Sequence, residues 1–190
     1  MKPSLISQAA NSQLVIIDVQ EKLAAAMAQD AMQQVLKNCG ILLQAAALLE
    51  IPAIYTEQYA KGLGPTLTEL LTLLSAGQAI TNQPIAKTAF SCCDEPTFNR
   101  RLTGDRPQII LAGMEAHICI LQTALALHAQ GRQVFVAEDA IISRSPTNKA
   151  NALARLEQAG VIVSNTESIV FEWLGKAEGS AFKPISKLIL

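Results

Sequence analysis

Short, unbroken runs of apolar residues recur along the chain, and they limit its fold more than any other feature. Pro or Gly residues precede most of these runs and mark their starts. A strand that is apolar at every position is buried on both faces, as in a parallel sheet with helices above and below it. We therefore predict five strands: Leu14–Asp18, Ala53–Thr56, Gln108–Gly113, Gln133–Ala137 and Val161–Val163.

Segments with helical periodicity lie between these runs. Ser145 and Pro146 provide an N-cap and a first-turn proline for one of them. Because strands and helices alternate, we predict an α/β fold: a three-layer, doubly wound, mainly parallel sheet with helices on both faces. The absence of repeats and linkers predicts that residues 1–190 form a single domain. The predicted helices are Ala31–Leu49, Ala116–Ala129, Thr147–Ala159 and a last one that starts at Thr166.

Charge and hydropathy exclude several classes of partner. The formal net charge is −1 and the charged residues are dispersed, so we expect no nucleic-acid partner. No apolar segment approaches the roughly 20 residues that span a membrane. The N-terminus also lacks the apolar core and cleavage site of a secretory signal. The low charged fraction of 16% favours apolar surface buried in a homo-oligomer.

The cysteines indicate a compartment rather than a fold. Their spacing forms neither a disulfide framework nor a zinc site, which favours a reducing, cytosolic location. Cys39 and the adjacent pair Cys92 and Cys93 are expected to pack. A redox role for the pair is a weaker alternative, since adjacent cysteines form a strained ring when oxidised.

Ligands of such sheets bind beyond the carboxyl ends of the strands, so residues that end strands are the first candidates for a site. Asp18 closes the first run and is either an N-cap or a functional group. Cys119 follows Gly113 by six residues, in a first helical turn that favours a thiolate. Most free cysteines are nevertheless small buried residues. Lys87 either extends its ammonium group to water or pairs with a carboxylate in a pocket.

The two histidines supply neither a convincing base nor a metal site. His117 precedes Cys119 by two residues and so lies on another helical face, and we expect His128 to be structural. Without a His-x-His or Asp-x-His pair we predict no metal, and without a Gly-rich phosphate motif we predict no nucleotide cofactor. A thiol nucleophile then needs another base, and Asp18 is the leading candidate.

Together, Asp18, Lys87 and Cys119 resemble the catalytic residues of the isochorismatase-like cysteine hydrolases, a superfamily that includes nicotinamidases and N-carbamoylsarcosine amidohydrolase. Thr56–Pro65 is most similar to the isochorismatase domain-containing group, whose members mostly have no assigned substrate. The segments that carry the wider resemblance are Leu14–Gln20 (a strand ending in Asp-x-Gln), Ile85–Ser91 (the lysine segment) and Gly113–Ala124 (the nucleophile turn).

The resemblance implies a role for each of these residues. Cys119 would attack an electrophilic carbon, Asp18 would take its proton, and Lys87 would lower the pKa of the thiol and orient the pair. It also implies a cis peptide bond between Met114 and Glu115. The oxyanion hole would consist of the backbone N–H groups of Glu115 and Cys119.

Two departures from the family pattern reduce the number of reactions that this chain is expected to catalyse. Nicotinamidases carry a metal site with an Asp-x-His ligand set after the second strand, where this chain has Glu57, Gln58 and Tyr59. We therefore expect neither nicotinamidase activity nor a bound metal. True isochorismatases lack the nucleophilic cysteine, so Cys119 argues against isochorismate as the substrate.

We accordingly predict a cysteine-dependent hydrolase of a small amide-type substrate that acts through a covalent thioester. The alternative hypothesis is a non-catalytic, oligomeric binding or scaffold protein that retains the hydrolase fold, although an intact catalytic set argues against it. The strand-end rule suggests five residues for the substrate pocket, each of which could instead serve in loop or core packing: Gln20, Leu23, Glu57, Tyr59 and Phe90.

Overall fold

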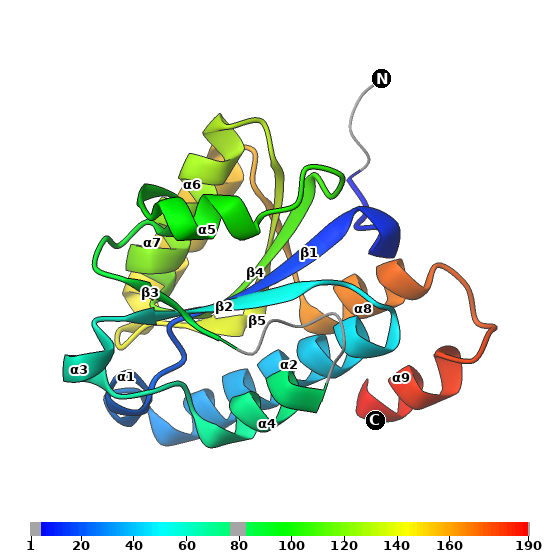
Figure 1. Ribbon diagram of the computed structural model, residues 1–190, viewed down its shortest axis with the longest axis horizontal. Helices are drawn as coiled ribbons and strands as arrows, with labels where there is room; N and C mark the ends of the chain where they lie inside the picture. The colour runs from blue at the N-terminus through cyan, green and yellow to red at the C-terminus, as the bar shows by residue number, and fades with distance from the viewer. Residues whose placement is uncertain (1–4, 77–82, 190) are drawn as a thin grey trace.

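The computed structural model describes residues 5–76 and 83–189, so part of the N-terminal segment assessed for a secretory signal lies outside it. Six strands form one sheet in the order β3-β2-β1-β4-β5-β6, and every neighbouring pair is parallel (Figure 1). The predicted α/β fold is therefore confirmed. The strands are β1 (Ser12–Ile17), β2 (Ala53–Gln58), β3 (Ile85–Lys87), β4 (Gln108–Met114), β5 (Gln133–Ile142) and β6 (Ile162–Ser164).

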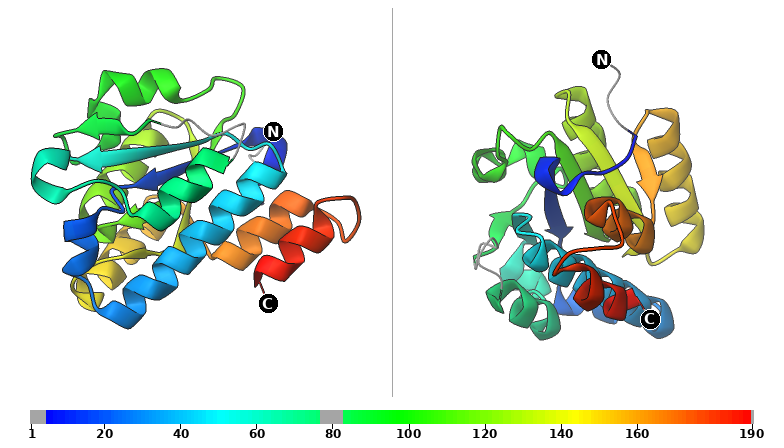
Figure 2. Two further views of the ribbon diagram at one scale, coloured as in Figure 1. Left: turned by 60° about the horizontal axis from the view of Figure 1, so that its bottom comes forward. Right: turned by 90° about the vertical axis from the view of Figure 1, so that its right-hand side faces the viewer.

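Helices cover both faces of this sheet (Figures 1 and 2). One face carries α2 (Gln29–Leu48), α4 (Thr68–Ala76), α8 (Thr166–Leu174) and α9 (Phe182–Ile189). The other carries α5 (Pro96–Arg101), α6 (Leu121–Ala129) and α7 (Pro146–Gln158). The short helices α1 (Glu21–Ala25) and α3 (Ala60–Leu63) lie beyond the carboxyl ends of β1 and β2. Three further elements are single helical turns: the 3-10 turns η1 (Ala9–Asn11) and η2 (Cys92–Asp94), and the π-helical turn η3 (Ala116–Ile120).

The unbroken apolar runs are explained by two cores, one on each face of the sheet. In β1, Leu14 and Ile16 pack into the core beneath α2, whereas Val15 and Ile17 pack into the core beneath α6. All four are at most 1% exposed, so both faces of this part of the strand are buried in apolar surroundings. Burying one such side chain contributes roughly 1.5–3 kcal/mol to stability.

The structure departs from the predicted elements in several places, and the helices α1, α3, α4, α5 and α9 were not among those predicted. The predictions missed β3, because three residues that end in a lysine show no apolar run. The predicted helix over 116–129 is divided into the π-helical turn η3 and α6. Ser145 precedes α7, with Pro146 in the first turn as predicted, but its side chain makes no capping hydrogen bond; instead its carbonyl oxygen accepts from the backbone N–H of Asn148.

Across residues 5–76 and 83–189, no helix is long and apolar enough to cross a bilayer.

Gly113 permits a close approach between β1 and β4 where the nucleophile turn begins. It pairs with Ile17 across the two strands and has a φ of +119°. A Cβ atom at this position would lie 2.0 Å from the carbonyl oxygen of Ile17, which is inside any allowed contact. Only glycine satisfies both the backbone conformation and the space.

We therefore expect Gly113→Ala to lower the free energy of unfolding by about 3 kcal/mol, through backbone strain and a clash in the centre of the sheet. Urea denaturation followed by the fluorescence of Trp173, the single tryptophan, would measure the change. Gly104→Ala is the matched control, because nothing lies within 4 Å of its Cβ position. Equal stabilities for the two variants would contradict this account of Gly113.

Candidate functional site

Three strand ends bring Asp18, Lys87 and Cys119 together at the carboxyl edge of the sheet. Asp18 follows β1 in a left-handed conformation with a φ of 52°. Lys87 is the last residue of β3, and Cys119 lies in the turn η3 that follows β4. The three residues are 0%, 2% and 6% exposed, so their interactions are weakly screened by water.

A buried ion pair forms the centre of this cluster. Lys87 Nζ lies 2.7 Å from Asp18 Oδ2 and donates to Cys119 Sγ at 3.5 Å. The other carboxylate oxygen, Oδ1, accepts from the hydroxyl of Thr56 at 2.7 Å. Within the described part of the chain, Oδ2 accepts no well-directed hydrogen bond besides its contact with Lys87. Oδ2 is thus the carboxylate oxygen with capacity for a proton.

The same surroundings hold the thiol neutral and the lysine charged. Burial first, and then the negative charge of Asp18, raise the pKa of Cys119 to about 12, although Lys87 lowers it. Burial lowers the pKa of Lys87, but Asp18 and the nearby thiols outweigh this and raise it above its ordinary value. Lys87 thus acts on the thiol in the expected direction, but the net pKa of Cys119 is raised rather than lowered. At neutral pH the site therefore holds a neutral thiol next to a charged ammonium group.

The nucleophile turn is supported from the side of β5. The Met114–Glu115 peptide bond is cis, as the resemblance implies. The Glu115 carboxylate accepts from the backbone N–H of Arg144 at 2.9 Å and pairs with its guanidinium at 3.2 Å. Next to it, His117 Nδ1 lies 2.9 Å from Ser143 Oγ. An oxyanion role for the backbone N–H groups of Glu115 and Cys119 stays a prediction.

The family model described as "Isochorismatase domain" matches residues 12–168. The chain belongs to the isochorismatase family. "Isochorismatase domain-containing protein 2" of Danio rerio is 40% identical over 179 residues, which cover 94% of this chain and 86% of the relative.

Solved structures of similar proteins extend the family comparison. The "MAR1 Ribonuclease" from Caenorhabditis elegans superposes with a TM-score of 0.86 and 37% identity, covering 97% of this chain and 92% of its own. YcaC from Escherichia coli, described as an octameric hydrolase of unknown specificity, has a TM-score of 0.86, 21% identity and coverage of 99% and 92%. Since the first is named a ribonuclease, the exclusion of nucleic acid on the basis of charge has no support from the family.

The five residues predicted for the pocket occupy different environments. The side chain of Gln20 is buried and joins Gln58 and Gly64, and buried Glu57 accepts from the backbone N–H and the hydroxyl of Thr66. Leu23 packs against the core beneath α2. Tyr59 and Phe90 are exposed at 60% and 53%. Three of the five thus brace the fold, and contact of any of them with substrate stays a prediction.

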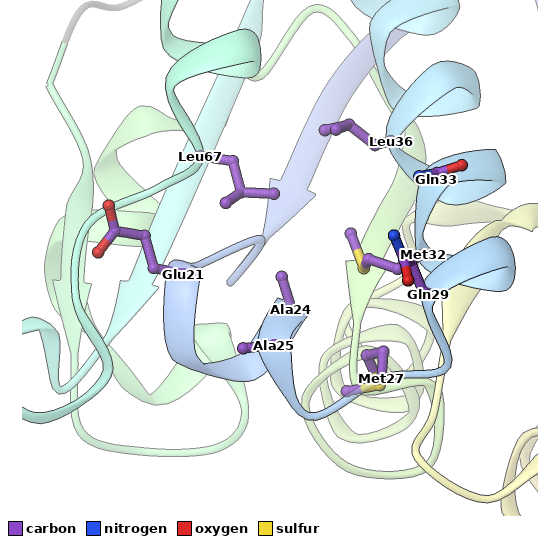
Figure 3. Close-up of a pocket in the computed structure, with 9 residues that line it drawn as sticks. All are labelled: Glu21, Ala24, Ala25, Met27, Gln29, Met32, Gln33, Leu36 and Leu67. Atoms are coloured by element: carbon purple, nitrogen blue, oxygen red, sulfur yellow. The ribbon is translucent and has the colours of Figure 1, made fainter.

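Cavities near this edge differ in their relation to the cluster. One of about 470 Å³ lies between α3 and the segment after β3 and is lined by Tyr59, Lys61, Lys87 and Glu95, among others. Another, of about 400 Å³, lies between α1 and the start of α2 (Figure 3). Its lining is largely apolar, with Met27, Met32 and Leu67 directed into it, and it includes none of the three clustered residues. The first is therefore the better candidate for substrate access.

Three residues of the site were missed by the sequence analysis. Thr56 binds Asp18, Gln58 binds Lys87, and Arg144 binds Glu115. The strand-end rule reached the end of β2 and the residue that follows it, but we selected Glu57 and Tyr59 from this segment. Side chains alternate along a strand, and it is Thr56 and Gln58 that face the cluster. The register of β2, which no single sequence pattern supplies, decides between the two sets.

The remaining histidines and cysteines lie outside the cluster's direct contacts. His117 binds Ser143 and Asn148, and His128 lies beside Gly160. Cys39, Cys92 and Cys93 are free and buried, as expected for packing. No three His, Cys, Asp or Glu side chains of residues 5–76 and 83–189 group as a metal-ligand set.

The buried ion pair between Lys87 and Asp18 leads to a prediction about the stability of the protein. Asp18→Asn would leave the Lys87 ammonium buried without a counter-charge, and we expect a loss of about 3–5 kcal/mol in the free energy of unfolding. The double variant Asp18→Asn with Lys87→Met removes both charges and should recover most of that loss. Urea denaturation of all four proteins in this double-mutant cycle would measure the coupling.

The exposed ion pair between Lys176 and Glu178 is the control for this cycle. Its Glu178→Gln variant should cost less than about 1 kcal/mol, because solvent screens the pair. Strictly additive effects of the Asp18 and Lys87 variants would contradict a coupled buried pair.

Proposed function

We propose that this protein is a cysteine-dependent hydrolase that cleaves a small amide-type C–N bond through a covalent thioester, with Cys119, Asp18 and Lys87 as its catalytic residues. The observation that carries the proposal is the contact of one buried ammonium group with both the carboxylate and the sulfur. Thr56 and the ion pair hold the carboxylate in place. Family membership supports hydrolysis, and this arrangement supports the use of a thiol nucleophile.

Acylation begins with the neutral thiol. Cys119 Sγ attacks the carbonyl carbon while Asp18 Oδ2 accepts the proton of the S–H group. The oxygen of the tetrahedral intermediate would be bound by the backbone N–H groups of Glu115 and Cys119. The C–N bond then breaks as Asp18 returns the proton to the leaving nitrogen, so that a thioester and a free amine or ammonia result.

Deacylation follows the same route with water as the nucleophile. Asp18 takes a proton from water, whose oxygen attacks the thioester carbon. The C–S bond then breaks as Asp18 returns the proton to the sulfur, which gives a carboxylic acid and the regenerated thiol. Lys87 remains protonated throughout, because its pKa is raised. Its charge stabilises the sulfur as negative charge develops there.

Hydrolysis can be tested with a panel of small primary amides and carbamoyl compounds, by measurement of released ammonia. Cys119→Ala should abolish turnover, and Asp18→Asn should reduce kcat by roughly 10²–10⁴-fold, the usual contribution of a general base. Cys39→Ala, which removes a buried thiol elsewhere in the core, should retain the activity. Turnover that survives Cys119→Ala would refute the proposed nucleophile.

Alkylation by iodoacetamide tests the same thiol without a substrate. Mass spectrometry at pH 7 should show that Cys119 reacts faster than Cys39, and that Asp18→Asn slows the reaction of Cys119 by about tenfold or more. Removal of the Asp18 charge would by itself lower the pKa of Cys119 and accelerate alkylation. A slower reaction would therefore identify Asp18 as a base, whereas a faster one would show that it acts only through its charge.

Ribonuclease activity is a second candidate, and the likeness to the C. elegans protein named a ribonuclease favours it. A labelled single-stranded RNA incubated with the wild type and with Cys119→Ala would separate the two functions. Cleavage by both proteins would indicate a different site, and cleavage by the wild type alone would make RNA a substrate of Cys119. Neither outcome is expected under the amide proposal.

A second proposal concerns the assembly of the protein. We propose a homo-oligomer, supported by the high apolar content and by the octameric assembly described for YcaC. A cytosolic location stays a prediction from the free cysteines. The hypothesis of a non-catalytic scaffold protein would be favoured if the wild type turned over neither amides nor RNA.

A further inference from the structure

The ammonium group of Lys87 is held by a residue that the proposed reaction does not use. Lys87 Nζ donates to Gln58 Oε1 at 2.5 Å, a shorter contact than its 3.2 Å and 3.3 Å contacts with the carbonyl oxygens of Ala89 and Phe90. An ammonium group has three hydrogens to direct. Two of these hydrogens point to the closest acceptors, Asp18 and Gln58, and this fixes the direction of the third hydrogen. The third hydrogen is shared among Cys119 Sγ and the two carbonyl oxygens.

Gln58 is itself held on both sides. It ends β2 opposite Lys87 in the parallel register, and its Nε2 donates to the carbonyl oxygen of Thr88 at 2.8 Å. Its backbone N–H donates to Gln20 Oε1 at 2.8 Å, while Gln20 Nε2 donates to the carbonyl oxygen of Gln58 at 3.1 Å. The buried side-chain amide of Gln20 thus forms two hydrogen bonds with the backbone of Gln58. These bonds fix the position from which the Gln58 side chain extends.

The neutrality of this acceptor matters to the chemistry. A carboxylate at position 58 would form a second ion pair with Lys87 and draw the ammonium charge away from Asp18 and Cys119. An apolar side chain would leave a buried N–H group without its closest neutral partner, which is costly in a site of low polarity. A glutamine orients the ammonium group without adding a second negative charge beside it.

We infer that Gln58 is a positioning residue, whose side-chain oxygen aims the Lys87 ammonium group at Cys119 and Asp18 without neutralising it. This inference deepens the proposed function and rests on it. Gln58 touches none of the reacting atoms in this scheme and acts through Lys87. Its removal should thus reduce the reactivity of Cys119 even though every catalytic residue is still present.

Two variants of Gln58 separate orientation from charge. Gln58→Glu keeps the length of the side chain and an oxygen acceptor but adds a negative charge, and Gln58→Met keeps the length without an acceptor. We expect both to slow alkylation of Cys119 by iodoacetamide roughly tenfold or more, since small misplacements of a positioned group have effects of this order. Gln44→Glu on α2 is the matched control, because its side chain donates within its own helix, to Gly40, and it should react like the wild type.

A spectroscopic signal reports on the contact itself. In protein with ¹⁵N-labelled lysine, the buried Lys87 ammonium group should give a protected resonance, which is identified by its loss in Lys87→Met. Gln58→Met should broaden or remove this resonance through faster exchange with water, whereas Gln58→Glu should retain it at a shifted position. A resonance unchanged in both variants would overturn the inference, and so would Cys119 reactivity at the wild-type rate.

The two proposals fail in distinguishable ways. If Cys119 of the wild type reacts no faster than Cys39, the thiol is not activated and the proposed function fails before any variant of position 58 is made. The lysine resonance still decides whether Gln58 holds Lys87 in that case. Amide-proton spectra of both variants must match the wild type outside this edge of the sheet; if they do not, a general loss of structure explains the slower reaction and Gln58 has no specific positioning role.

Discussion

The ion pair between Lys87 and Asp18 is the interaction on which the rest of the site depends. Two charges removed from water lose several kcal/mol of solvation each, so the surrounding protein must satisfy them in full. The Thr56 hydroxyl and the Gln58 amide do so from β2, and the carbonyl groups after β3 complete the set. The Asp18 side of the pair raises the pKa of Cys119 and that of Lys87. Burial and this electrostatic contact together keep the thiol neutral and the lysine charged.

Support for the site comes from two sides of the sheet. On the β2 side, Gln20 and Gln58 fix the lysine. On the β5 side, Arg144 holds Glu115 at the start of the nucleophile turn. Each of these polar side chains forms its hydrogen bonds with other groups of the protein. Rigid positioning of this kind lowers the cost of reorganisation when charge develops during a reaction.

The sequence predicted the parts of this structure that depend on local pattern. The unbroken run at Leu14–Asp18 revealed a doubly buried strand, and its terminal carboxylate pointed to the site. Roles that depend on register or on the balance of charges were not predictable. Thr56 and Gln58 differ from Glu57 only in the face they present, and β3 is too short to show a pattern. The raised pKa of Cys119 follows from burial and from Asp18, which outweigh the lysine that sequence reasoning emphasised.

The edge position of β3 has a consequence for how the site comes into being. Lys87 belongs to the outermost strand of the sheet, while its partners Asp18 and Cys119 follow the two central strands. These contacts join segments far apart in sequence, and such contacts form only after long loops have closed. Intermediates that contain the central strands alone would have the nucleophile and the base without their cation. Chemical competence therefore requires the edge strand as well as the centre of the sheet, and a chain in which β3 is not paired carries a cysteine without its cation.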